Sequence, residues 1–314
     1  MSLSNRPAQS SGDWPHRLAV FTACATFPLL FIGALVTSKG AGLAVPDWPT
    51  TFGYNMFLYP WSQMVGGIFY EHSHRLFASL VGLLTIALAL ALWFQERRNW
   101  LRWLGVAALG LVVAQGVVGG LRVILLEHTL AIVHACFAQA FFALTVSLAF
   151  FTSSEWSKEY IDRPLADGGR LRRLCAITTG LIYLQGFFGA VLRYTGERVD
   201  AHLLFAVLVA LHVVFIVVRV KKFHSDRVNL VRPAAVLGLL LLLQLSLGVV
   251  SYFAKFTSLL RLSATALVSL TTTHLVIGAL MLATSLLMAL RAFRLSATPR
   301  PSVEQEVSTE QFPV

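Results

Sequence analysis

The feature that most constrains this chain is a series of apolar runs, each about as long as a bilayer is thick and each bounded by charged residues or by Pro and Gly. An α-helix rises about 1.5 Å per residue, so about 20 apolar residues are enough to cross the hydrocarbon core. Eight such runs are present, at approximately 18–38, 72–94, 103–121, 129–151, 174–194, 201–219, 233–253 and 264–290. We therefore predict an all-α polytopic membrane protein with eight transmembrane helices.

Composition excludes the main soluble classes. Of the 314 residues, 56% are hydrophobic and only 13% are charged, which is more apolar surface than a soluble domain of this length can bury. The net charge of +10 would suggest nucleic acid in a soluble protein, but basic loops of a membrane protein explain it, so no nucleic-acid partner is expected. The three cysteines are isolated within apolar runs, which argues against a disulfide framework and a zinc site. The N-terminal residues do not resemble a cleaved signal peptide.

The distribution of basic residues predicts the orientation. An even number of crossings places both termini on one side, and most of the 25 Lys and Arg residues lie in the termini and in the loops of that side. By the positive-inside rule the termini are cytoplasmic. The predicted helices at 72–94, 129–151, 201–219 and 264–290 then run from the outside inward.

The two halves of the chain resemble each other. The pattern His74-Arg-Leu-Phe-Ala78 is echoed by His202-Leu-Leu-Phe-Ala206, which indicates two pseudo-repeated four-helix bundles. The motif Gln-x-x-x-Gly supports this reading, since it occurs as Gln115-x-x-x-Gly119, Gln185-x-x-x-Gly189 and Gln244-x-x-x-Gly248. The predicted division is a cytoplasmic N-terminus (1–17), an N-terminal bundle (18–151), a cytoplasmic linker (152–173), a C-terminal bundle (174–290) and a disordered cytoplasmic tail (291–314).

The first outer loop, at 39–70, is the longest on its side and carries Trp48 and Trp61. Tryptophan favours the membrane interface, so we expect this loop to lie over the helix ends. It is either a lid or interfacial packing, and the sequence leaves both open.

Four histidines occupy matching places in the inward-running helices: His74, His134, His202 and His274. Each half thus offers two imidazoles from two helices at similar depth, in the outer half of the bilayer. Two facing imidazoles in a four-helix bundle can bind a haem from both sides, so we predict haem iron at both pairs. The competing interpretation is hydrogen bonding between helices.

One asymmetry separates the halves. Glu71 lies three residues before His74, on the same helix face, whereas Val199 stands at the matching place before His202. An intramembrane carboxylate can relay protons or stabilise positive charge. We therefore expect the first half to do chemistry and the second to hold a permanent redox cofactor.

Four arginines at the outer helix ends have two interpretations. They either bind haem propionates or snorkel to the interface: Arg75, Arg122, Arg193 and Arg198. Of the remaining histidines, His72 is a candidate for substrate contact and His212 is expected to pack or to form a hydrogen bond. His16 and His224 are assigned to cytoplasmic segments, and His128 to the outer end of a helix.

The motifs together resemble the heme A synthase family over residues 18 to 290. The matching segments are Glu71-x-x-His74-Arg75-Leu with Gly82-Leu-Leu, Gln115-Gly-x-x-Gly119-Gly120, Leu130-Ala-x-x-His134-x-x-x-Ala138-Gln139, and Gln185-Gly-x-x-Gly189-x-x-x-Arg193-Tyr-Thr-Gly196. Two departures stand out. The loop at 39–70 lacks the cysteine pair of many relatives, and Leu203 follows His202 where Arg is frequent in the family.

The resemblance implies oxidation of the C8 methyl of haem O to the formyl group of haem A, for a haem-copper oxidase. Glu71, His74 and His134 would form the catalytic site, and His202 and His274 would bind haem b. Arg75, Arg193 and Arg198 are the candidates for contacts with the haem cofactors. It further implies the bacterial cytoplasmic membrane, an upstream haem O synthase and an unidentified electron carrier, with a homo-oligomer among the possible states. The alternatives are a dihaem b-type electron-transfer subunit and a non-enzymatic haem carrier or assembly factor.

Overall fold

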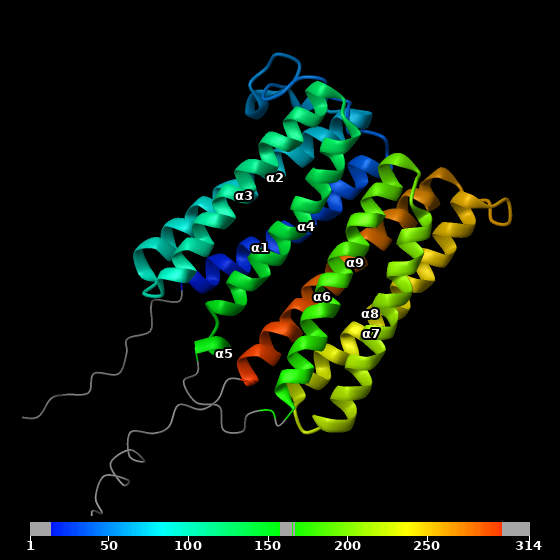
Figure 1. Ribbon diagram of the computed structural model, residues 1–314. Helices are drawn as coiled ribbons and strands as arrows, with labels where there is room; N and C mark the ends of the chain where they lie inside the picture. The colour runs from blue at the N-terminus through cyan, green and yellow to red at the C-terminus, as the bar shows by residue number, and fades with distance from the viewer. Residues whose placement is uncertain (1–13, 158–164, 166, 297–314) are drawn as a thin grey trace, which may run out of the picture.

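The computed structural model describes residues 14–157, 165 and 167–296, and helices dominate this part of the chain (Figure 1). The α-helices are α1 (Trp14–Ser38), α2 (Gly66–Gln95), α3 (Asn99–Leu125), α4 (His128–Phe151), α5 (Ser154–Ser157), α6 (Gly168–Thr195), α7 (Val199–Phe223), α8 (Val228–Phe256) and α9 (Ala264–Leu295). Two short 3-10 turns, η1 (Met56–Leu58) and η2 (Trp61–Gln63), lie in the loop between α1 and α2. In the described residues the only extended pairing is an isolated bridge between Thr51 and Tyr54, so the all-α prediction is confirmed.

Eight of these helices are long and apolar enough to cross a membrane, and they correspond to the eight predicted runs. Several begin earlier than predicted. The first starts at Trp14 rather than at residue 18, and Pro15 suits its first turn because proline needs no amide hydrogen there. The helix predicted from residue 174 starts at Gly168. Hydropathy marks only the apolar part of a helix, and the backbone stays helical through the polar turn before it.

The early start of α6 shortens the predicted linker at 152–173, which also contains the short helix α5. The predicted disordered tail begins as helix, because α9 continues to Leu295. The remainder of that tail, most of the predicted N-terminus and part of the linker lie outside the described residues.

The long helices pack as two sets of four. Helices α1, α2, α3 and α4 contact one another in a closed ring, here called the first unit, and α6, α7, α8 and α9 form a second ring, here called the second unit. Helix α1 packs against α9 between the units, and α4 packs against α6 and α9, so the units lie side by side (Figure 1). That the units are repeats of one another stays a prediction.

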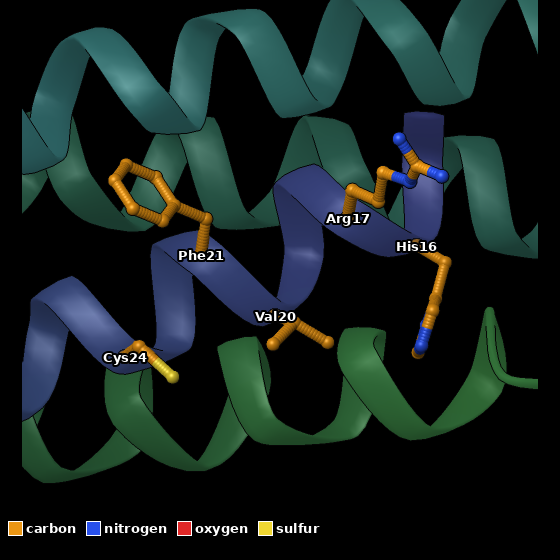
Figure 2. A pocket seen from close by; sticks show the side chains of 5 residues that line it. All are labelled: His16, Arg17, Val20, Phe21 and Cys24. Atoms are coloured by element: carbon orange, nitrogen blue, oxygen red, sulfur yellow. The ribbon is translucent and has the colours of Figure 1, made fainter. Parts of the chain in front are cut away.

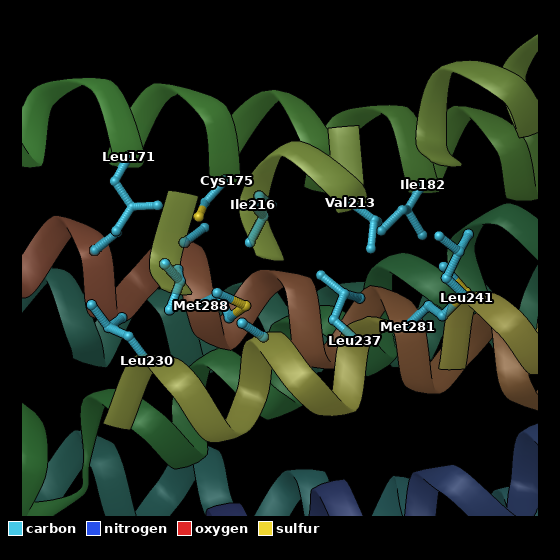
Figure 3. Packing of buried hydrophobic residues seen from close by; sticks show 14 of the residues in the cluster. Leu171, Cys175, Ile182, Val213, Ile216, Leu230, Leu237, Leu241, Met281 and Met288 are labelled. Atoms are coloured by element: carbon cyan, nitrogen blue, oxygen red, sulfur yellow. The ribbon is translucent and has the colours of Figure 1, made fainter. Parts of the chain in front are cut away.

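The apolar cores fill one half of each unit. In the second unit the core includes Leu171, Ile216, Leu237 and Met288, which interdigitate from all four helices (Figure 3). A corresponding cluster in the first unit centres on Leu88 and Leu148.

Both cores end at the same distance from the predicted ligands. Within these two cores, the first buried member that follows the histidine on each histidine-bearing helix comes seven residues after it, namely Val81, Phe141, Val209 and Met281. Seven residues correspond to about 10 Å along a helix. The four histidines therefore lie beyond the apolar cores, toward the end of the units that carries the 39–65 loop. We call this the loop end.

Candidate functional site

His202 on α7 and His274 on α9 face each other inside the second unit. Their ring centroids are 6.5 Å apart, with the ring planes at 67°. Two imidazoles that bind one metal ion from opposite sides, each through a bond of about 2 Å, hold their centroids about 6 Å apart. The spacing of this pair therefore fits the two axial ligands of a haem iron.

A glycine of the preceding helix supports each of the four rings. An added Cβ at Gly189 would lie 3.2 Å from Cε1 of His202, and one at Gly248 would lie 3.2 Å from Cε1 of His274. These are close contacts, so only glycine leaves the rings in place.

The first unit repeats the arrangement. An added Cβ at Gly33 on α1 would lie 3.1 Å from Cε1 of His74, and one at Gly119 on α3 would lie 2.8 Å from Cε1 of His134. The same glycine contact thus recurs at all four predicted ligands. Gly33 escaped the sequence analysis because Leu29, not glutamine, precedes it by one turn.

The ring nitrogens are suited to an added ligand. Nε2 of His202 lies 3.4 Å from the side-chain amide nitrogen of Gln185, and Nε2 of His274 lies 3.3 Å from that of Gln244. Both distances are long for hydrogen bonds between nitrogen and nitrogen or oxygen. In all four imidazoles the Nδ1 atom is buried without a hydrogen-bond partner.

Such orphaned imidazole nitrogens call for an explanation such as a bound group. Within the described residues no three His, Cys, Asp or Glu side chains gather as a metal-binding group, so each unit offers a pair of imidazoles rather than a larger ligand set. A pair of neutral nitrogen donors is the set that a haem takes from its protein, since the macrocycle supplies the other four ligands. The residues present therefore fit a haem.

Glu71 and Arg75 turn away from this arrangement, toward the loop between α1 and α2. Glu71 is buried, with Oε1 accepting from Nη2 of Arg75 at 2.9 Å and Oε2 accepting from the backbone N–H of Val45 at 2.9 Å. The Arg75 guanidinium also donates to three loop carbonyls, those of Val45 at 2.9 Å, Asp47 at 2.7 Å and Thr50 at 3.0 Å. The pair thus fastens residues 45–50 to α2.

His72 reinforces this attachment. The residue is only 1% exposed, its Nδ1 lies 3.1 Å from the hydroxyl of Thr51, and its ring packs against that of Tyr59 with centroids 5.1 Å apart. The structure thus separates the motif Glu71-His72-Ser73-His74-Arg75: His74 is directed toward Gly33 inside the unit, whereas its charged and aromatic neighbours hold the loop.

The loop is also held against α3. Nη2 of Arg122 donates to the carbonyl of Gly42 at 3.1 Å, and the Trp48 ring lies so close to Gly120 that an added Cβ would be 2.2 Å from it. The loop therefore covers the end of the first unit, as Figure 1 shows. Its position is that expected of a lid or of interfacial packing.

Asp47 stabilises the turn inside this loop. Its carboxylate accepts hydrogen bonds from the Thr50 hydroxyl and from the backbone N–H groups of Phe52 at 2.8 Å and Gly53 at 2.9 Å. Desolvation raises the pKa of this carboxyl, but the hydrogen bonds outweigh it and hold the pKa below its usual range.

The arginines predicted near propionates have different surroundings. Arg193 on α6 donates from Nη2 to the carbonyl of Ala34 at 2.9 Å and to the hydroxyl of Ser38 at 2.6 Å, both on α1. Arg198 is exposed at the start of α7 and lies 3.5 Å from Asp200. Arg75 is committed to the loop, as described above.

The remaining histidines lie apart from the two pairs. Nδ1 of His212 lies 2.9 Å from the carbonyl of Leu208 on its own helix, as expected for a hydrogen-bonding residue. His224 contacts Asp167 at 2.8 Å near the opposite end, and His128 is exposed. His16 lines a shallow groove with Cys24 on α1, near α4 (Figure 2). This groove contains none of the four predicted ligands.

The structure also reveals contacts that the sequence analysis missed. Ser38 lies between the units and contacts Arg193, Thr271 and Thr272. Nearby, the hydroxyls of Thr37 and Tyr194 are 3.2 Å apart. Short hydroxyl side chains carry no periodic signal, so only the packing of α1 against α6 and α9 identifies them.

Comparison with known proteins gives one family match. The model of the COX15-CtaA family, described as cytochrome oxidase assembly protein, matches residues 16–199. This range includes the first unit and α6, with His74 and His134. It ends just before His202, so the assignment of His202 and His274 as a ligand pair is supported by their geometry and not by this match.

Two curated relatives carry the name heme A synthase. The protein of Shouchella clausii is 33% identical over 149 residues, which cover 46% of this chain and 48% of the relative. The protein of Alkalihalophilus pseudofirmus is 34% identical over 103 residues, which cover 32% of this chain and 33% of the relative. The matches thus span about half or less of these relatives' lengths.

Proposed function

Because the chain belongs to the COX15-CtaA family of cytochrome oxidase assembly proteins, we propose that it is a heme A synthase, which oxidises the C8 methyl of haem O to a formyl group. The observation that carries the proposal is the facing pair His202 and His274, with ring centroids 6.5 Å apart. The matching glycine contacts of His74 and His134 support a second haem position in the first unit.

The two units have different roles in this proposal. His202 and His274 hold haem b in the second unit, and haem b supplies one-electron redox chemistry there. His74 and His134 hold the iron of haem O, the substrate, in the first unit. The glycines behind the rings keep the imidazoles directed inward, so the substrate macrocycle is oriented before its methyl group reacts.

Glu71 is the proposed acid–base group of the first unit. With water as the oxygen source, oxidation of the methyl to the formyl group takes up one water molecule and releases four protons and four electrons. The electrons leave through haem b to the electron carrier, and a carboxylate one turn from His74 can accept protons. Its hydrogen bonds to Arg75 and Val45 hold the carboxylate in one orientation at the base of the loop. The loop above it covers the end of the first unit through its contacts with α2 and α3.

The proposed setting is the bacterial cytoplasmic membrane, with both termini cytoplasmic and the haem positions in the outer half of the bilayer. The basic loops described above support this orientation. A haem O synthase would supply the substrate, and an electron carrier would reoxidise haem b.

Haem extraction tests the proposal. The protein is co-expressed with a haem O synthase in a host that lacks haem A, and the extracted haems are identified by chromatography. Haem A should accumulate with the wild-type chain and be absent with His74→Ala. A protein that shows a b-type spectrum and leaves haem O unchanged would instead be an electron-transfer subunit or a haem carrier.

A further inference from the structure

The units meet through an apolar middle and a polar end. Leu30, Phe142, Ala279 and Ala283 form a small buried cluster from α1, α4 and α9. Toward the loop end the contacts become polar, and Ser38 at the end of α1 is their centre.

The Ser38 hydroxyl uses its full hydrogen-bonding capacity there. It accepts from Nη2 of Arg193 at 2.6 Å and from the hydroxyl of Thr272 at 3.0 Å. The hydroxyl of Thr271 lies 3.2 Å away and is 3.0 Å from the carbonyl of Leu267 on its own helix, to which it donates. Ser38 therefore donates to Thr271. A hydroxyl has one donor and two acceptor positions, and all three are satisfied across the boundary between the units.

These hydrogen bonds lie within about one helical turn of His274 and of the two glycines that contact His74 and His202. On α1, Ala34, whose carbonyl accepts from Arg193, follows the glycine that supports His74. On α6, Arg193 comes one turn after the glycine that supports His202. On α9, Thr271 precedes His274 by three residues. A shift at Ser38 would therefore move both pairs.

Arg193 has a second edge available. Both of its hydrogen bonds come from Nη2, while Nε and Nη1 form no hydrogen bond within the described residues. Arg193 also forms no ion pair with any described residue, so no carboxylate in this part of the chain neutralises its charge. A guanidinium can bind one partner on each edge, so the second edge of Arg193 is available to a carboxylate while the first binds α1.

We propose that Ser38 and Arg193 are positioning residues that lock the two units together at the loop end and fix the haem b pair relative to the substrate pair. The inference rests on the proposed function for the identity of the haems. Nη2 of Arg193 binds α1, and its other edge faces an anionic group such as a propionate of haem b. Occupancy of the second unit thereby stabilises the boundary with the first.

The test uses the purified full-length protein with haem b bound. Ser38→Ala removes the central hydroxyl, and Ser38→Thr retains a hydroxyl. Ser246→Ala is the matched control, because the Ser246 hydroxyl is exposed on α8 and bonds only to the Leu242 carbonyl of its own helix. Two quantities are measured: the rate of haem b transfer to apomyoglobin and the midpoint potential of haem b.

Loss of one hydrogen bond between membrane helices corresponds to about a threefold change in an equilibrium or rate. Ser38→Ala removes three such bonds, so it should release haem b at least about threefold faster and change its midpoint potential. Ser38→Thr should return both quantities toward wild type, and Ser246→Ala should change neither. Thr272→Val should act in the same direction as Ser38→Ala, which keeps the proposal testable if one variant does not fold.

The double variant Ser38→Ala/Arg193→Lys shows whether the two residues stabilise the boundary between the units together or independently. Arg193→Lys keeps the charge but loses the two-edged geometry. If the two residues act together, Ser38→Ala should add little to the effects of Arg193→Lys. Fully multiplicative effects, or Ser38→Ala and Thr272→Val values equal to those of Ser246→Ala, would overturn the proposal. Neither readout involves haem A, so failure of the proposed reaction is seen separately in the extraction experiment.

Discussion

Glu71 and Arg75 lie one turn apart on α2, joined by a bond of 2.9 Å, and together they bind the backbone of the loop above the first unit. The carboxylate accepts from one loop N–H, and the guanidinium donates to three loop carbonyls. A neighbouring face of the same helix turn presents His74 to Gly33 in the interior of the unit. Loop closure and ligand position in the first unit are therefore set by one short stretch of α2.

Replacement of Glu71 should loosen this loop. Glu71→Ala leaves the buried Arg75 without its counter-charge, a change that typically costs about 3 kcal/mol. We expect faster tryptic cleavage after the exposed Lys39, loss of haem A formation and an intact haem b spectrum. Glu127→Ala is the control, because this carboxylate is exposed at the same end of the first unit. Equal cleavage in both variants would show that the pair does not hold the loop.

The ligand assignment of the second unit is tested by exchanging its histidines. His274→Ala removes one of the two facing imidazoles, so the reduced-minus-oxidised spectrum of haem b should disappear. His212→Ala should retain it, because that ring bonds to the backbone of its own helix and lies apart from the pair. Unchanged b-type absorbance in His274→Ala would refute the assignment.

The helices and the positions of the candidate ligands could be predicted from the sequence because both leave a regular signal, whereas the role of these histidines as haem ligands stays a prediction. Hydropathy marks the spans, and the repeated spacing of His74, His134, His202 and His274 separates them from the other histidines. The loop contacts of Glu71 and Arg75 could not be predicted, since the loop has no periodicity and its backbone carbonyls are invisible in a sequence. The role of Ser38 was hidden for a related reason: a serine at a helix end is the expected polar terminus whether or not another helix contacts it.

The glycines behind the rings give a graded prediction. Ala at Gly189 would place its Cβ 3.2 Å from His202, so the ring must shift by a few tenths of an ångström. Gly189→Ala should lower the haem b content per protein. Gly186→Ala, three residues earlier on α6, meets nothing within 4 Å and should keep haem b, with a helix more stable by up to about 1 kcal/mol. The haem-to-protein ratio after purification measures both.

A parallel comparison in the first unit extends this prediction. The Cβ of Gly119→Ala would lie 2.8 Å from His134, closer than at Gly189, whereas Gly116→Ala meets nothing within 4 Å. Gly119→Ala should therefore impair haem A formation more than Gly116→Ala while leaving haem b in place. Equal activities of the two variants would mean that the ring of His134 does not depend on this contact.

The turn held by Asp47 should depend on pH only in acid. The folded carboxyl has a pKa below its unfolded value of about 3.9, because hydrogen bonds from Thr50, Phe52 and Gly53 outweigh desolvation. Its stabilisation of the turn is therefore complete above the unfolded pKa and is lost as the pH falls through the folded pKa.

Hydrogen exchange of the peptide containing Phe52 and Gly53, corrected for intrinsic rates, should show protection that is constant near neutral pH and falls below about pH 4. In Asp47→Asn, which carries no charge to lose, protection should be lower at neutral pH and should not fall further in acid. Protection that declines between pH 7 and pH 5 in the wild-type chain would contradict the assignment to this carboxylate, since no proton binds to it in that interval.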